Sequence, residues 1–309
     1  MKKTPLTAAQ QFELRQALHV ATLDALLASR RWQPGELVFQ GGTSLHLAHG
    51  SPRFSEDLDF LVHSTLDLTG ISAAIEARLA GTPWLPTGTK LTVSKAKDAH
   101  NPHAFVVAVG GPKVIGAVRV KVKLWQTTKE SMASLGVSVH PVRLASGLGA
   151  GAQAFVPTAD LSEIFADKVF AVGARPYMKP RDLFDLRWIL QRKPGGVVTQ
   201  GELETRLDMY PNETPTSWLK KAEDRLDSLP KSVPAVKSDL QRWLPSHWQI
   251  GDAEALEIVN VSVAALTQAI VEMRVVATKR PAPAQAAAAA AAPRTAAAAP
   301  AAPAQRPRR

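Results

Sequence analysis

Two aspartates, Asp57 and Asp59, stand two residues apart at the start of an apolar segment that continues to Val62. Side chains alternate across a β-strand, so a strand here directs both carboxylates to the same side. Two such carboxylates repel each other unless a cation lies between them, and Mg²⁺ or Mn²⁺ prefers oxygen ligands. The pair therefore predicts a divalent-metal site with Asp57 and Asp59 as ligands. Two spaced aspartates alone are a weak signal, because short motifs often match by chance.

A glycine-rich segment shortly before the aspartates strengthens this interpretation. It follows the apolar residues 37–39 and contains, in order, Gly41, Gly42, Thr43 and Ser44. We expect a buried strand, then a sharp turn whose glycines let a ligand approach the backbone closely. Thr43 or Ser44 would cap a helix running to Leu47, whose free N–H groups can bind phosphate. Phosphate held beside a metal ion is the arrangement used for nucleotidyl transfer by in-line displacement.

A lysine in the second half of the chain lies on a face that we expect to be buried. Asp160 and Glu163 have the spacing of a capping box, and the apolar residues that follow recur at helical spacing. Lys168 falls within that apolar stripe, four residues after Ile164 and four before Val172. An ammonium group there needs a partner or a ligand, unless its long stem carries it to the rim.

Two further acids follow Pro180, which is well placed to begin a helix. Asp182 in the first turn suits a structural role, as a cap or in an ion pair with Arg175 or Arg181. Asp185 lies deeper, between apolar neighbours, where it would pair with Lys168 or reach the active site as a base or metal ligand. Its spacing does not distinguish these roles.

Residues 116–125 alternate as a strand with valines on one face and cations on the other. The cations are Arg119, Lys121 and Lys123. Two interpretations remain open: Lys121 or Lys123 contacts triphosphate or RNA, or the face is simply solvated.

Two blocks of this sequence resemble the AbiEii/AbiGii family of nucleotidyltransferase-like toxins, which includes the MenT toxins and belongs to the polymerase-β-like superfamily. The first block is Gly41-Gly42-Thr43 with Arg53-Phe54-Ser55-Glu56-Asp57-Leu58-Asp59-Phe60. The second is Ala166-Asp167-Lys168, Arg175 and Arg181-Asp182-Leu183-Phe184-Asp185-Leu186. The resemblance covers roughly residues 4–192.

The resemblance implies an α/β nucleotidyltransferase core with a mixed sheet, followed by a helical domain. It implies that the nucleoside triphosphate (NTP) is bound by Gly41, Gly42, Thr43, Ser44 and Arg53, and that Asp57, Asp59, Lys168 and Asp185 are catalytic. Lys168 would face phosphate, and Asp185 would act as base or third acid. The acceptor would be RNA, particularly a tRNA end, and the protein a toxin with a cognate antitoxin. One departure stands out: the strand that often carries a third carboxylate in this superfamily offers cations here.

Composition limits the remaining possibilities. The chain has 309 residues, no cysteine and a net charge of +10. Six of those charges lie in residues 279–309, an Ala/Pro-rich basic tail that we expect to be disordered. The absence of cysteine excludes a disulfide scaffold and suits the cytoplasm, and the N-terminus lacks the apolar core of a signal peptide. We expect a nucleotidyltransferase core in residues 1–150 and a helical domain in residues 151–278.

The motifs also fit a non-catalytic NTP- or RNA-binding module of the same fold, and a transferase that modifies protein. A separate hypothesis concerns Ser55, two residues before Asp57. Phosphate on Ser55 would compete for the metal and repel the phosphates of the substrate, which would silence the enzyme.

Overall fold

The computed structural model describes residues 4–97, 101, 103–112, 114–144, 147–210 and 212–280. Its centre is a seven-stranded mixed sheet with the order β4-β5-β7-β3-β2-β9-β8. The strands are β2 (Leu37–Gln40), β3 (Leu58–His63), β4 (Lys90–Lys95), β5 (Ala104–Gly110), β7 (Ala117–Thr127), β8 (Val137–Arg143) and β9 (Gln153–Ala159). A short separate sheet pairs β1 (Thr4–Pro5) with β6 (Val114–Ile115). We predicted a disordered tail over residues 279–309. From residue 281 onward, this tail lies outside the described ranges.

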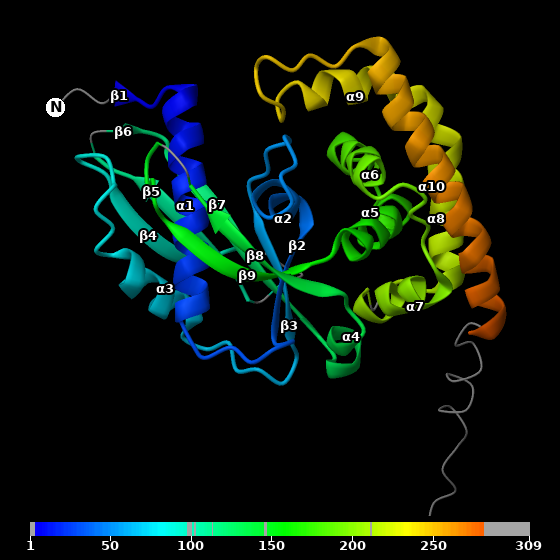
Figure 1. Cartoon of the computed structure of the whole chain (residues 1–309), viewed down its shortest axis with the longest axis horizontal. Helices are drawn as coiled ribbons and strands as arrows, with labels where there is room; N and C mark the ends of the chain where they lie inside the picture. The colour runs from blue at the N-terminus through cyan, green and yellow to red at the C-terminus, as the bar shows by residue number, and fades with distance from the viewer. Residues whose placement is uncertain are drawn as a thin grey trace, which may run out of the picture.

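Helices cover both faces of the large sheet (Figure 1). On one face lie α1 (Ala8–Ala28) and α3 (Ile71–Leu79). On the other lie α5 (Leu161–Ala174), α6 (Pro180–Arg192), α7 (Gln200–Met209), α8 (Pro215–Ser228), the 3₁₀ turn η1 (Leu229–Ser232), α9 (Val233–Leu240) and α10 (Asp252–Lys279). The short helices α2 (Gly41–Leu47) and α4 (Lys129–Ala133) connect strands. The mixed α/β fold with a following helical part, predicted from the sequence, is confirmed.

The alternation of β3 divides its residues between two hydrophobic cores. Leu58, Phe60 and Val62 are buried against α1 and α3, whereas Leu61 is buried against the helices of the second half. Asp59 has the same parity as Leu61, so its side chain faces the helical half. The sheet and the later helices therefore enclose the site from opposite sides.

Several local predictions were right in kind but wrong in detail. Neither Thr43 nor Ser44 caps α2: the helix begins at Gly41, and Gln40 occupies the N-cap position without a side-chain bond. Asp160 is the N-cap of α5, but its side chain makes no capping bond. Instead, its carboxylate accepts a hydrogen bond from Ser138.

The sheet extends past the predicted boundary at residue 150. β9 pairs with β8 and β2, so the chain makes one more strand before α5 begins at Leu161. Gly147, Gly149 and Gly151 lie in the segment that joins β8 to β9. The alternately buried Ala154, Val156 and Thr158 explain why the following residues form a strand.

By length and composition, α10 is the one helix in the described ranges that is apolar enough to cross a membrane. It packs against α5, α6, α7, α8 and α9. Val259, Leu266 and Met273 are buried in these contacts, whereas Leu256 of the same helix is exposed.

Candidate active site

Asp57 and Asp59 meet a lysine of the neighbouring strand. β3 runs parallel to β7 with Asp59 opposite Lys123. The Lys123 Nζ atom lies 2.6 Å from Asp57 Oδ2 and 3.4 Å from Asp59 Oδ1. Both carboxylates therefore point to one side, as predicted. The cationic face of this strand was expected either to contact triphosphate or RNA or to be solvated. Neither interpretation included the contact of Lys123 with the two aspartates.

Burial and neighbouring charges change the ionisation of Asp59 and of Lys123. Burial raises the pKa of Asp59, and the nearby Asp57 adds to this effect, although Lys123 opposes it. Burial alone would lower the pKa of Lys123, but Asp59 and Asp57 outweigh burial and raise it. Lys123 therefore stays charged and holds the two acids together without any other cation.

The aspartate pair fits a divalent cation only if water and substrate phosphates supply the remaining ligands. Among the described residues, no group of three or more His, Cys, Asp or Glu side chains is arranged to hold a metal. Asp57 and Asp59 supply two carboxylates on the wall of an open pocket. Mg²⁺ commonly uses one or two carboxylates and completes its shell with water and substrate phosphates. The donor set fits that mode, and Lys123 would have to move aside from the carboxylates.

The two glycines allow the backbone to pass close to charged side chains. Gly41 has φ +82°, a left-handed conformation, and a Cβ atom there would lie 3.4 Å from Asp59 Oδ2. At Gly42 a Cβ atom would lie 2.4 Å from Arg53 Nη2. Both glycines line the pocket. A side chain at either position would fill the space beside the acids.

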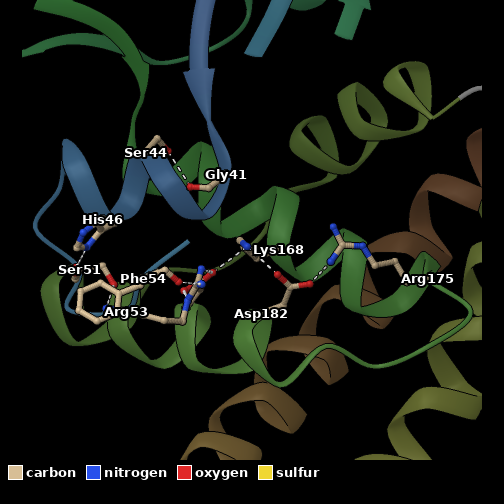
Figure 2. Close-up of polar contacts among 10 residues, drawn as sticks. Gly41, Ser44, His46, Ser51, Arg53, Phe54, Lys168, Arg175 and Asp182 are labelled. Atoms are coloured by element: carbon tan, nitrogen blue, oxygen red, sulfur yellow. Dashed lines mark hydrogen bonds and ion pairs between the residues drawn. The ribbon is translucent and has the colours of Figure 1, made fainter. Parts of the chain in front are cut away.

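Thr43 and Ser44 are buried and already hydrogen-bonded within the protein. The Thr43 hydroxyl donates to the carbonyl oxygen of Asp57. The Ser44 hydroxyl donates to the carbonyl oxygen of Gly41 over 2.8 Å (Figure 2). These bonds fix the glycine turn against the strand that carries the acids.

Three cations and two acids form a buried chain of ion pairs beside the pocket (Figure 2). Arg53 pairs with Asp185, whose Oδ2 atom also lies 2.8 Å from Lys168 Nζ. Lys168 Nζ lies 2.6 Å from Asp182 Oδ1, and Arg175 binds the other oxygen of Asp182. The buried lysine of α5 thus has the partners that its position demands. The alternative that its stem carries it to the rim is wrong, since Lys168 is 7% exposed.

The two acids of α6 differ in their access to the pocket. Asp182 lines the pocket, whereas Asp185 is fully buried behind it and contacts Arg53 and Lys168. Burial opposes the charge of Asp182, but Lys168 and Arg175 outweigh it and hold its pKa well below the usual range. Of the roles left open for Asp185, the geometry shows the ion pair with Lys168.

The pocket has a volume of ≈ 320 Å³ and is dominated by charged side chains. Its charged lining consists of Arg53, Glu56, Asp57, Asp59, Lys123, Asp167, Lys168, Arg175, Lys179, Arg181 and Asp182. Among the described residues, Lys179 and Arg181 make no ion pair with a carboxylate. Lys179 lies over the ring of Tyr177, and Arg181 lies over the ring of Trp243. These two cations are available to an anionic ligand.

Sequence reasoning did not identify several residues of the site. Lys179, Trp125 and Tyr210 line the pocket without belonging to the motifs. His19 of α1 was also missed: its Nε2 atom lies 2.9 Å from the carbonyl oxygen of Glu56, just before the aspartates. Only its position within an apolar helical stripe signals that His19 is buried.

His46 and His49 hydrogen-bond to backbone oxygens. His46 Nδ1 lies 2.7 Å from Ser51 O, and His49 Nε2 lies 3.0 Å from Ala159 O.

This fold, with paired acids beside a glycine turn and a cationic pocket, defines a nucleotidyltransferase. The model of the family described as nucleotidyl transferase AbiEii toxin, type IV toxin–antitoxin system, matches residues 24–240. The chain belongs to this family of toxin nucleotidyltransferases.

The likeness to the solved structure of MenT4 supports the fold. MenT4, a nucleotidyltransferase toxin from Mycobacterium tuberculosis, is 18% identical with a TM-score of 0.53, over 92% of this chain and 94% of that chain. JHP933 from Helicobacter pylori is 17% identical with a TM-score of 0.48, over 89% of this chain and 99% of that chain. No curated protein matched the chain significantly.

Proposed function

We propose that the protein transfers a nucleoside monophosphate from an NTP to an RNA end, with tRNA as the preferred acceptor, in a Mg²⁺- or Mn²⁺-dependent reaction that releases pyrophosphate. The observation that carries this proposal is the paired carboxylates of Asp57 and Asp59 on the wall of a pocket rich in cations. The role would be that of a cytoplasmic toxin checked by a cognate antitoxin.

Asp57 and Asp59 would hold the metal ion, which would supply Lewis-acid stabilisation of the phosphate charge when bound. Gly41 and Gly42 would let the triphosphate approach the backbone. Lys123, displaced from the acids, would remain within reach of the same phosphates and keep the local charge balanced. This arrangement gives Lys123 a role in both the empty and the loaded site.

The remaining cations suit the rest of the triphosphate. Lys179 and Arg181 line the pocket without a carboxylate partner. Burial lowers the pKa of Lys179, and the neighbouring Arg175 adds to this effect. A bound phosphate would offset both effects. Lys168 would act through Asp182 and Asp185, and also directly where it lines the pocket.

Closeness to the pocket does not by itself identify the catalytic base. Asp182 faces the pocket but is held ionised by two cations, and Asp185 is enclosed. Asp182 is a weak proton acceptor while Lys168 and Arg175 hold its pKa low. We therefore propose that the main work of the two acids is to orient Lys168, Arg175 and Arg53. Asp185 acts as a base only if substrate binding releases it from Arg53.

The test is to incubate the purified protein with each α-³²P-labelled NTP, Mg²⁺ and total RNA, then with lysate protein freed of RNA. We expect label on RNA, more than 100-fold weaker label with Asp59→Ala, and none after EDTA treatment. Asp227→Ala, a change at an exposed residue outside the pocket, is the matched control and should retain full transfer. Unaltered RNA labelling by Asp59→Ala would refute the assignment.

Two other outcomes correspond to the alternative functions. Label on protein would identify a protein-modifying nucleotidyltransferase, whose site would contain the same motifs. NTP binding without transfer to any acceptor would identify a non-catalytic binding module. Lys123 already pairs with both acids. This pairing favours the non-catalytic module only if Mg²⁺ does not bind.

A further inference from the structure

A second pocket, with a volume of ≈ 650 Å³, adjoins the active-site pocket. The two pockets share Gln40, Trp125, Asp167, Arg175 and Tyr210 in their linings. A ligand held in the ionic pocket would therefore reach the second pocket past these side chains.

The second pocket differs from the first in its chemistry. Apolar and aromatic side chains form much of its wall, from Leu61, Trp125, Met209 and Tyr210. A few polar groups interrupt this wall, among them Gln126 and Glu213. Its volume is in the range of small-molecule sites, and an apolar wall with a few placed polar groups is typical of them. A nucleobase has this combination of flat apolar faces and a polar edge.

Trp125 connects the two pockets. It lies two residues after Lys123 on the same face of β7, about 6.6 Å along the strand. Trp125 is opposite Leu61 of β3, just as Lys123 is opposite Asp59. Trp125 also contributes to the apolar wall of the second pocket. A phosphate at the aspartates would thus lie about one sugar length from the aromatic wall.

We propose that the second pocket holds an unstacked nucleobase against the ring of Trp125. The inference rests on the proposed nucleotidyl transfer and deepens it. The base comes from one of two sources with the same chemistry: the NTP, or the terminal nucleotide of the acceptor. Stacking on aromatic rings tolerates every base, because every base has a π-face.

The test compares Trp125→Phe with Trp125→Leu. Both variants lose the indole N–H group, and only Phe keeps an aromatic face, so their difference isolates stacking. Calorimetry with Mg²⁺ measures the Kd of each NTP and of inorganic triphosphate, and transfer assays give the KM for tRNA. We expect Leu to be about 5- to 100-fold weaker than Phe. The loss appears in NTP affinity if the base is that of the NTP, or in the KM for tRNA if it is that of the acceptor.

Inorganic triphosphate should bind the two variants equally, because it has no base. A second variant tests the pocket without touching Trp125: Pro176 is exposed and lines only the second pocket. Pro176→Trp should obstruct base binding, and Pro176→Ala should not. Equal NTP affinity and equal KM for tRNA in Phe and Leu, with no effect of Pro176→Trp, would overturn this inference alone. A wild-type protein that binds neither NTP nor inorganic triphosphate would overturn the proposed function with it.

Discussion

Arg53 and Asp185, which are 132 residues apart in the chain, form a two-point ion pair. Arg53 Nε lies 2.7 Å from Asp185 Oδ1, and Arg53 Nη2 lies 2.7 Å from Asp185 Oδ2. Both side chains are almost completely buried. The pair ties the segment that precedes Asp57 and Asp59 to α6, so the sheet and the helical half share one site.

Breaking this pair should destabilise the whole fold. Asp185→Asn keeps the size of the side chain but leaves Arg53 and Lys168 short of a counterion in the interior. Removing one partner of a buried pair costs about 3–5 kcal/mol, and we expect that loss in the free energy of unfolding, measured with urea. The matched control is Asp24→Asn, which breaks the exposed pair with Arg78 and should cost less than about 1 kcal/mol. Similar small losses in both variants would mean that the buried pair is not a structural tie.

Gly42→Ala should disturb the site through Arg53. The new methyl group would come within 2.4 Å of Arg53 Nη2, and Arg53 cannot easily move because Asp185 holds it. We expect a loss of about 1–3 kcal/mol in stability, with at least tenfold slower transfer. Gly81→Ala, at a position with open space around it, is the control. Thermal unfolding measures the change in stability, and initial rates measure the change in transfer. A fully active, stable Gly42→Ala protein would contradict the expected crowding.

His19 should make the protein less stable in mild acid. Burial lowers its pKa from 6.5 to about 4. Between those values the unfolded chain binds a proton that the folded protein does not. Stability therefore falls as the pH falls from 6.5 to 4, by about 3 kcal/mol from this residue.

The measurement is urea unfolding at pH 7 and pH 4.5. His19→Gln cannot take up the proton, so its stability should depend less on pH than that of the wild type. The exposed His247 gives the control variant His247→Gln, which should keep the wild-type slope. The same slope in all three proteins would show that His19 is not buried as a neutral group.

Ser55 lines the active-site pocket, where added negative charge would meet the aspartates. Ser55→Glu should slow transfer at least tenfold, because the carboxylate repels substrate phosphates and competes for the metal. Ser55→Gln has the same shape without the charge and should be clearly more active. Initial transfer rates compare the two, with Ser55→Ala as a reference. If protein carrying phosphate on Ser55 transferred nucleotide at the normal rate, this regulation would be ruled out.

The sequence by itself determined the elements of the site and their order. The alternation of residues 58–62 and 117–125 predicted two strands, and β3 and β7 are found there. The helical stripe around Lys168 predicted its burial, and Pro180 predicted the start of α6. Each of these features depends on residues close together in the chain. Over such short distances, the periods of strands and helices determine which side chains share a face.

Only the tertiary structure decided which charges meet. Lys123 and Asp59 become neighbours through the register of two strands that are far apart in the sequence. Arg53 and Asp185 pair because α6 packs against the loop before β3. The roles of the acids follow from these contacts: Asp182 faces the pocket, while Asp185 lies behind it. The energy of a charge depends on its burial and its nearest partners, and chain spacing does not specify either when the partners lie far apart in the sequence.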